Sequence, residues 1–268
     1  MTSLAFPHPN RRFATWLLVS GLCSLALPSP AQCEPSTTPT AAEGSDQAFQ
    51  VTVEVMEVDP DSGKQTSLDL HLVLFVDGKS YDFALTQPRD VTVLDPVAGK
   101  ITLLSREKHV KTTLATEDLV TTAVRVRQYA KNEGIEERLG IGAKVTRQGN
   151  QFAVGYAGFR YDVATAGPQS ATQPAKFAEF TNWVARLNLI RKLGTPPFAR
   201  MELGRSIAAA GRLPETVTLR LGSDGQQRTL LSKYRFERGL SDAAAKRIDE
   251  VAGMTTLYRE VALGAFPK

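Results

Sequence analysis

Alternating apolar and polar residues predict a run of β-strands in the first half of the chain. Three valines alternate with polar residues over positions 51–55, which is the two-residue period of a strand with one buried face. A longer alternating run at 68–76 is followed by Asp77-Gly78 and a second run at 81–85. Asp-Gly between two such runs predicts a β-hairpin, because both turn residues adopt positive φ. Further strands are predicted at 91–94, 101–104 and 110–114, which completes an antiparallel meander of about six strands.

Helical periods follow in the second half of the chain, together with further hairpins. Apolar residues recur at steps of four, three and four from Leu119 to Ala130, which predicts an amphipathic helix that ends near Gly134. Because strands and helices do not alternate strictly, the pattern predicts an α+β fold with a mainly antiparallel sheet that curves round a helix or closes partly into a barrel. The other predicted elements are a short helix at 135–139, a hairpin at 144–166 bent at Gly149-Asn150 or Gly158, helices at 177–190 and 198–210, a hairpin at 216–236 with a turn at Asp224-Gly225, and a last helix capped at Ser241 or Asp242.

The first 31 residues have the order of a secretory signal peptide. Arg11 and Arg12 precede an apolar run at 13–27, and the small residues needed for cleavage follow at 29–31. The run is about fifteen residues long and a membrane span needs roughly twenty, so we expect cleavage and no transmembrane span afterwards. Residues 32–48, rich in Pro, Ser, Thr, Ala and Gly, are predicted to be a flexible linker, and 49–268 a single α+β domain. The predicted location is the periplasm or cell envelope, with full secretion as the alternative.

Charge and cysteine content narrow the possible partners. The net charge of +4 falls to +2 without the signal peptide, because that segment holds two arginines and no acidic residue. This near balance gives no support to a nucleic-acid partner, although the sequence pI is about 9.1. Cys33 would be the sole cysteine of the mature chain, so no internal disulfide is predicted. Gln32 before it fits a lipid-attachment signal poorly, and lipidation at Cys33 is kept as an alternative.

Sequence motifs for catalysis, metal binding and cofactors give little support to an enzyme. His71 and His109 have no His, Cys, Asp or Glu at metal-ligand spacing, and His71 is expected to be a hydrogen-bonded sheet residue. Gly140-Ile141-Gly142 lacks the rest of a dinucleotide fingerprint, and a helix stop before a strand explains it. The adjacent acids Glu136-Glu137 are interpreted as helix-start residues. We therefore predict no catalytic residue, no cofactor and no metal.

The first strands are apolar on both faces, which is the pattern closest to a binding function. An open sheet with one face in water alternates cleanly. Here Val73 and Phe75 interrupt the polar face of their strand, and Leu94 and Leu104 do the same in later strands. Either helices cover the second face, or a curved sheet holds an apolar ligand, and the two arrangements are compatible. The candidate ligand-lining residues are Val73, Phe75, Phe83, Leu94 and Leu104.

The hairpin through Asp77-Gly78-Lys79 with Tyr81 and Phe83, and the segments 225–229 and 234–242, carry a family resemblance. They are similar to the early meander and the last strands of the bacterial lipoprotein carriers of the LolA/LolB type. The resemblance covers a minority of the chain, and the helical insert at 173–211 departs from the family pattern. It implies a half-barrel wrapped over helices, with an apolar cavity for a lipid or acyl chain and without catalysis. No family site residue is carried over.

Three functions are compatible with the sequence. The first is an exported, non-enzymatic protein of LolA-like half-barrel type that binds a lipid or other apolar ligand in its sheet cavity. The second is a periplasmic interaction or structural module that has an envelope protein as partner and no ligand. The third is an exported hydrolase, whose converging acidic residues a single sequence does not reveal.

Overall fold

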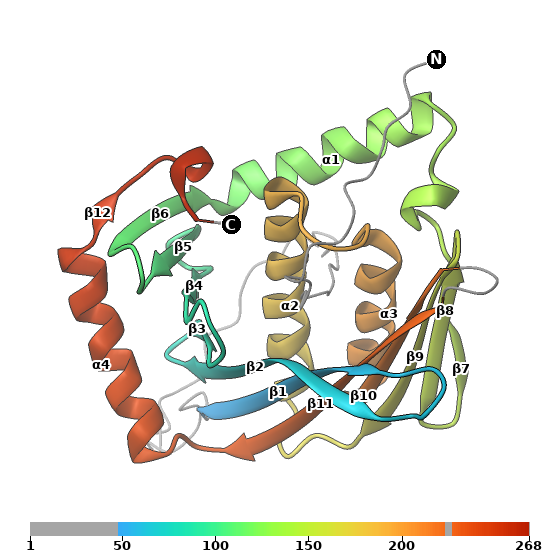
Figure 1. Ribbon diagram of the computed structural model, residues 1–268, viewed down its shortest axis with the longest axis horizontal. Helices are drawn as coiled ribbons and strands as arrows, with labels where there is room; N and C mark the ends of the chain where they lie inside the picture. The colour runs from blue at the N-terminus through green and yellow to red at the C-terminus, as the bar shows by residue number, and fades with distance from the viewer. Residues whose placement is uncertain (1–47, 223–226, 268) are drawn as a thin grey trace, which may run out of the picture.

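A computed structural model describes residues 48–222 and 227–267, and their strands form one mixed, mostly antiparallel sheet (Figure 1). The sheet has twelve strands in the order β12-β6-β5-β4-β3-β2-β1-β11-β10-β9-β8-β7, and only β12 and β6 run parallel. The strands are β1 (Phe49–Val58), β2 (Gln65–Val76), β3 (Lys79–Ala84), β4 (Val91–Asp95), β5 (Lys100–Ser105), β6 (Val110–Ala115), β7 (Thr146–Gln148), β8 (Gln151–Tyr156), β9 (Phe159–Ala166), β10 (Leu213–Leu221), β11 (Arg228–Arg238) and β12 (Arg259–Glu260).

Four α-helices complete the fold, and the predicted α+β class with a mainly antiparallel sheet is confirmed. They are α1 (Thr116–Asn132), α2 (Gln173–Arg191), α3 (Phe198–Ala209) and α4 (Asp242–Leu257), and short 3₁₀ helices occupy Glu137–Leu139 and Leu263–Ala265. The predicted signal peptide, Cys33, nearly all of the predicted linker and the predicted turn at Asp224-Gly225 lie outside the described residues.

Local signals in the sequence account for most element boundaries. The β2–β3 hairpin turns at Asp77 and Gly78, whose φ values of 51° and 71° are the positive values that the Asp-Gly motif predicts. Helix α4 begins after Ser241, whose Oγ accepts a hydrogen bond from the Ala244 amide (3.2 Å), as expected of an N-cap. The predicted hairpin at 144–166 turns at both proposed bends, so it contains three strands, β7 to β9, instead of two.

Helices α1, α2 and α3 lie on one face of the sheet. In Figure 1, β3–β6 lie on one side of α2, β1, β2 and β11 lie below it, and β8 and β9 lie beyond α3, while α1 crosses above both helices. Phe177 and Phe180 of α2 pack with Phe49 and Phe75 of the sheet, and all four are at most 4% exposed. Helix α2 therefore forms the centre of the largest apolar core.

Helix α4 covers the opposite face of β2–β5. Its Ala244, Val251 and Met254 pack against a second buried cluster that includes Leu74 and Phe83 of the sheet. Because successive strand residues point to opposite faces, Leu74 lies under α4 whereas Phe75 lies under α2. These two layers explain why the first strands are apolar on both faces, as one of the two sequence interpretations proposed.

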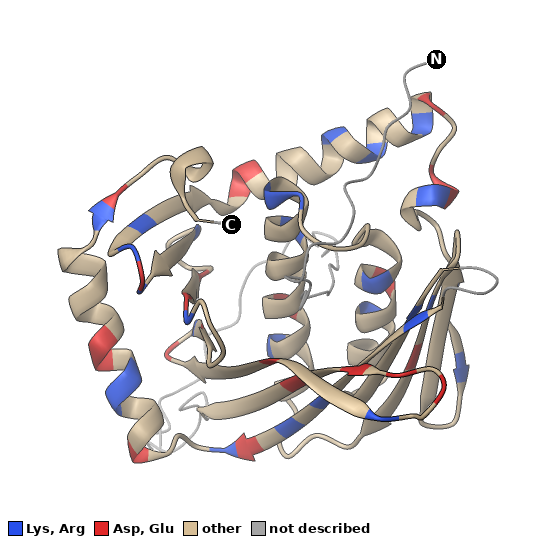
Figure 2. Cartoon of the chain, viewed as in Figure 1, with Lys and Arg blue, Asp and Glu red and all other residues tan. Residues whose placement is uncertain are grey.

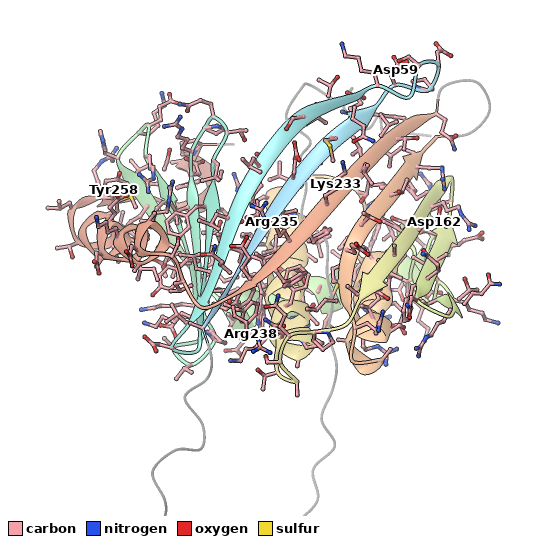
Figure 3. All side chains as sticks on the ribbon, turned by 90° about the horizontal axis from the view of Figure 1, so that it is seen from below. Asp59, Asp162, Lys233, Arg235, Arg238 and Tyr258 are labelled. Atoms are coloured by element: carbon pink, nitrogen blue, oxygen red, sulfur yellow. The ribbon has the colours of Figure 1, made fainter. Side chains whose placement is uncertain are left out.

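The face of β1 and β9–β11 turned away from α2 and α3 carries charged side chains. Lys233, Arg235 and Asp162 project from it in Figure 3, and Lys233 is paired in register with Glu54 of β1. Figure 2 shows positive and negative residues interspersed along the strands and helices. This face therefore has the alternating polar pattern of a sheet exposed to water.

Candidate functional site

The five predicted ligand-lining residues lie on two different faces of the sheet. Val73, Phe75 and Leu94 belong to the core under α2, whereas Phe83 and Leu104 belong to the core under α4. All five are at most 4% exposed. The apolar interruptions therefore belong to two packed layers, one on each face of the sheet.

Phe75 has the surroundings of a packed core residue. Its ring stacks on Phe49 with centroids 4.2 Å apart and a 6° interplanar angle, and the ring of Phe180 meets it edge-on at 5.6 Å. Offset-stacked and edge-to-face pairs of this kind contribute about 0.5–1.5 kcal/mol each beyond the burial of their area. Phe75 therefore packs as part of the core under α2.

A small hollow nevertheless reaches this core from outside, between α2 and the hairpins β2–β3 and β4–β5; we call it the α2 mouth. Phe75, Leu94 and Phe180 contribute apolar lining. The charged lining residues are Asp77, Lys79, Lys176 and Glu179. Its volume is about 120 Å³, room for roughly four waters at their liquid density of about 30 Å³ each. Ligand pockets commonly hold about 300–1,000 Å³, so the α2 mouth alone accommodates only the end of an apolar chain.

A buried Asp–His–Asp cluster lies on the α2 face of the sheet. His71 Nδ1 is 2.8 Å from Asp82 Oδ1, and His71 Nε2 is 3.0 Å from Asp69 Oδ2. Thr86 Oγ1 and the Leu70 amide donate hydrogen bonds to Asp69. Both ring nitrogens of His71 thus face carboxylates, and the expectation of a hydrogen-bonded sheet histidine is confirmed.

The charges in this cluster stabilise one another. Burial alone would lower the pKa of His71, but Asp82 and Asp69 outweigh it and raise that pKa to about 10. Burial would likewise raise the pKa of Asp69, and its hydrogen bonds to His71 and Thr86 instead hold it below its ordinary value. An imidazolium with both N–H groups directed at carboxylates is not available as a general base, so we interpret the cluster as a structural ion network.

Metal binding and membrane crossing gain no support from the part of the chain that the structure describes. Residues 48–222 and 227–267 contain no group of three or more His, Cys, Asp or Glu side chains placed to hold a metal ion. Over the same ranges, no helix combines the length and the apolar character that a membrane span requires.

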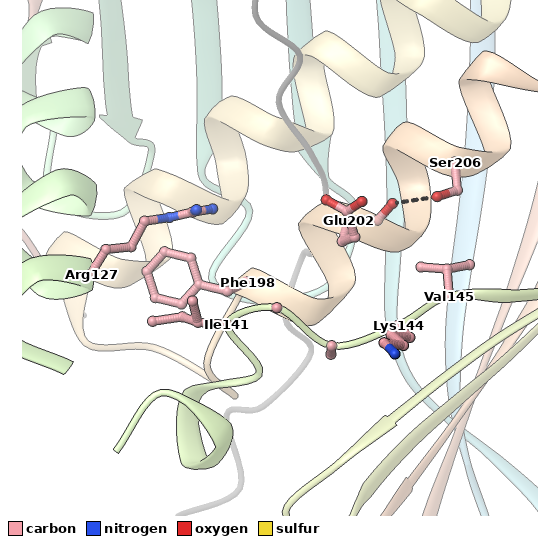
Figure 4. A pocket seen from close by; sticks show the side chains of 9 residues that line it. Arg127, Ile141, Lys144, Val145, Phe198, Glu202 and Ser206 are labelled. Atoms are coloured by element: carbon pink, nitrogen blue, oxygen red, sulfur yellow. Dashed lines mark hydrogen bonds between the residues drawn. The ribbon is translucent and has the colours of Figure 1, made fainter. Parts of the chain in front are cut away.

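A second and larger hollow lies between α1, the connector 141–145 and α3; we call it the α3 groove (Figure 4). Its volume is about 530 Å³, within the range of small-molecule sites. Arg127 of α1 reaches across to Phe198 at the start of α3, and its guanidinium carbon lies 4.8 Å from the centre of that ring. The other lining residues are Ile141, Gly142, Ala143, Lys144, Val145, Glu202 and Ser206.

Sequence reasoning missed the α3 groove. Arg127 falls within the helix predicted from Leu119 to Ala130, and Phe198 begins the helix predicted at 198–210, but these positions are 71 residues apart in the sequence. The available signal was the pair of glycines in Gly140-Ile141-Gly142, which mark a connector with special backbone geometry. Gly140 ends the short 3₁₀ helix with a φ of 70°, which confirms the predicted helix stop.

Comparison with known proteins assigns no family to this arrangement. No protein-family model matches the chain, and no curated protein matches it in sequence.

Proposed function

We propose that the chain is an exported, non-enzymatic binding protein. In this proposal the sheet and helices α1–α3 form a half-barrel similar to that of the LolA/LolB carriers, and an apolar or acyl chain enters between α2 and the sheet. The observation that carries the proposal is that the core around α2 continues to the surface at the α2 mouth, where Phe75, Leu94 and Phe180 contribute apolar lining.

The topology and the chemistry of the interior support this reading. In Figure 1, strands lie beside and below α2, with α3 between α2 and strands β8 and β9, and the contacts between α2 and the sheet are mainly apolar. Apolar contacts are non-directional, so an acyl chain can replace them without leaving a polar group unpaired. His71, the buried histidine of this face, has both nitrogens directed at carboxylates. These features favour binding over catalysis.

The size of the α2 mouth sets a condition on the proposal. A volume of about 120 Å³ admits the end of an acyl chain, so uptake of a whole chain requires α2 to move away from the sheet. Lys79 and Lys176 lie at the same hollow together with Asp77 and Glu179, and Lys79 is paired with Asp95 (3.1 Å), so the charges at the α2 mouth are mixed.

The direct test is a native mass spectrum of the mature protein purified gently from the compartment to which it is exported. The proposal expects a mature chain that begins near Gln32 and carries additional mass that organic extraction identifies as lipid. Uptake of a fluorescent fatty acyl probe by the same material gives an independent measurement.

A matched pair of variants locates the site. Leu94→Phe places a larger side chain at the α2 mouth, whereas Leu104→Phe makes the same change under α4. We expect Leu94→Phe to reduce probe uptake severalfold and Leu104→Phe to leave it unchanged, although overpacking costs each protein about 1–3 kcal/mol of stability. Equal effects of the two changes would argue against entry at the α2 mouth.

An interaction module without a ligand is the second candidate. The observation in its favour is the tight packing of Val73, Phe75 and Leu94, together with exposed apolar residues on the outer side of α1, where Val124 is 60% and Tyr129 is 53% exposed. A bare chain mass and no probe uptake would support this function, with an envelope protein as the partner to be isolated by pull-down.

A further inference from the structure

The α3 groove concentrates positive charge in a molecule whose charges are otherwise mixed. Arg127 and Lys144 line it, and a neighbouring hollow of about 370 Å³, which shares Val145 and Ser206 with it, adds Arg147. The one carboxylate that lines these two hollows belongs to Glu202, which already accepts hydrogen bonds from Arg205 of the same helix. The groove therefore has an excess of cations over available carboxylates.

Each arginine of the two hollows lies against an aromatic ring. The guanidinium carbon of Arg127 lies over the ring of Phe198 at 4.8 Å, and that of Arg147 lies over Phe152 at 5.3 Å. A guanidinium over a ring can still donate from its N–H groups to a carboxylate or phosphate, although the Nε of Arg147 already donates to the Gly149 carbonyl (3.1 Å). Within the described ranges, Arg127 has no carboxylate within ion-pair distance.

The wall of the groove is fixed by close packing. Gly140, at the start of the connector, has a φ of 70°, and a Cβ atom there would lie 2.8 Å from Ala199 Cβ and 3.0 Å from Tyr156 Cδ2. The connector therefore rests directly on α3, and Ile141 and Val145 line the groove beside Phe198. Preformed walls reduce the ordering cost of binding.

We propose that the α3 groove binds a small amphiphilic anion, with a carboxylate or phosphate head at Arg127 and an apolar part against Ile141, Val145 and Phe198. Lys144 adds a second positive charge at the other end of the groove (Figure 4). The site does not depend on the proposed function, because the α2 mouth has an entirely different set of lining residues. The volume of about 530 Å³ suits a small molecule better than a macromolecule.

The test titrates the mature protein with hexyl phosphate, hexanoate and 1-hexanol at low salt, by calorimetry and by amide chemical shifts. We expect binding of at least one of the two anions, weak or absent binding of 1-hexanol, and shifts at Gly142 and Ala143. Tighter binding of hexyl phosphate would identify a phosphate head, and tighter binding of hexanoate a carboxylate head. Added salt should weaken the binding, because exposed charges are screened over about 10 Å at 0.1 M.

Charge-matched variants assign the effect to the groove. Arg127→Gln removes a charge from the groove, whereas Arg125→Gln removes one from an exposed position of the same helix outside it. We expect Arg127→Gln to weaken anion binding by about tenfold, the loss of one charged hydrogen bond, and Arg125→Gln to leave it unchanged. Lys144→Gln provides a second groove variant, and thermal unfolding checks that all three remain folded.

Three results would overturn the proposal: no binding of either anion at millimolar concentration, equal binding of 1-hexanol, or equal weakening by Arg125→Gln and Arg127→Gln. The proposed acyl function is tested separately, because Leu94→Phe should not affect hexyl phosphate and Arg127→Gln should not affect acyl-probe uptake. Failure of one site is therefore distinguishable from failure of the other.

Discussion

Replacement of Gly140 by alanine tests whether the connector 141–145 is docked as closely on α3 as the geometry requires. Gly140 has a φ of 70°, and its added Cβ would lie 2.8 Å from Ala199 Cβ and 3.0–3.1 Å from two ring carbons of Tyr156. Neither neighbour moves easily. Ala199 is a fully buried residue of α3, and Tyr156 is held by a hydrogen bond from its hydroxyl to the Pro196 carbonyl (2.9 Å) and by stacking on Phe159.

Two physical costs add at this position. An L-residue in the left-handed region costs roughly 1–2 kcal/mol, and overpacking of a rigid core site costs about 1–3 kcal/mol. We therefore expect Gly140→Ala to lower the free energy of unfolding by about 2–5 kcal/mol. The free energy of unfolding of a native protein is about 5–15 kcal/mol in total. The variant should therefore still fold, but its urea denaturation midpoint should be clearly lower than that of the wild type.

Gly142→Ala is the matched control because it shares the strain and lacks the clash. Its φ is 76°, and nothing lies within 4 Å of the added Cβ. Only the conformational cost of roughly 1–2 kcal/mol applies, and any loss of unfolded-state entropy is common to both variants. The difference between the two variants, about 1–3 kcal/mol, therefore measures the close packing itself.

Urea denaturation of the wild-type protein and both variants, followed by circular dichroism and tryptophan fluorescence, provides the measurement. Coincident transitions of the two signals establish two-state unfolding, without which the free energies are undefined. Equal destabilisation by Gly140→Ala and Gly142→Ala would refute the reasoning, because it would mean that the connector does not rest on Ala199 and Tyr156. The α3 groove would then lack its fixed wall.

Three further perturbations follow from the structure. Because the pKa of His71 is raised to about 10 in the folded protein, the free energy of unfolding should fall as the pH rises from about 6.5 towards 10. Urea unfolding across this pH range measures the decline. His71→Asn should remove it, whereas the control His109→Asn should not. Burial raises the pKa of Asp90 to about 6, although a hydrogen bond from Ser105 acts in the opposite direction. Asp90→Asn should therefore raise the free energy of unfolding by about 2 kcal/mol at pH 8 and have little effect at pH 3.5. Equal gains in stability at both pH values would contradict a raised pKa for Asp90. Phe75→Ala and Phe83→Ala should each cost about 3–5 kcal/mol in the same assay, but only Phe75→Ala enlarges the α2 mouth and should increase uptake of a small apolar probe.

The hairpins and helices were predictable because their signals are local. Asp77-Gly78 predicts a turn with two positive φ values wherever it occurs between alternating runs, and the structure has that turn. The steps of four, three and four from Leu119 to Ala130 fix the buried stripe of α1, and both residues are fully buried. Propensity and period act over a few residues, so tertiary contacts are not needed to detect them.

The site was less predictable because its residues come from distant parts of the chain. Val73 and Phe83 are both apolar residues that interrupt the polar face expected of a sheet with one side in water. In the structure Val73 lies under α2 and Phe83 lies under α4. Apolar residues on both faces of a strand indicate that both faces are covered. They do not indicate which element covers each face, because apolar burial is non-directional. The same limit applies to the α3 groove, where Arg127 of α1 meets Phe198 of α3 only after the helices pack.

The sequence by itself determined most of the strands, the four α-helices, the Asp77-Gly78 turn and the α+β class, because period and turn chemistry are properties of short segments. Tertiary structure alone decided that β1 lies between β2 and β11, that β12 joins β6 in parallel, and that α4 shields the second face of the meander. Those pairings join segments far apart in the chain, and many alternatives satisfy the same local pattern. Only the mutual fit of the packed layers selects among them.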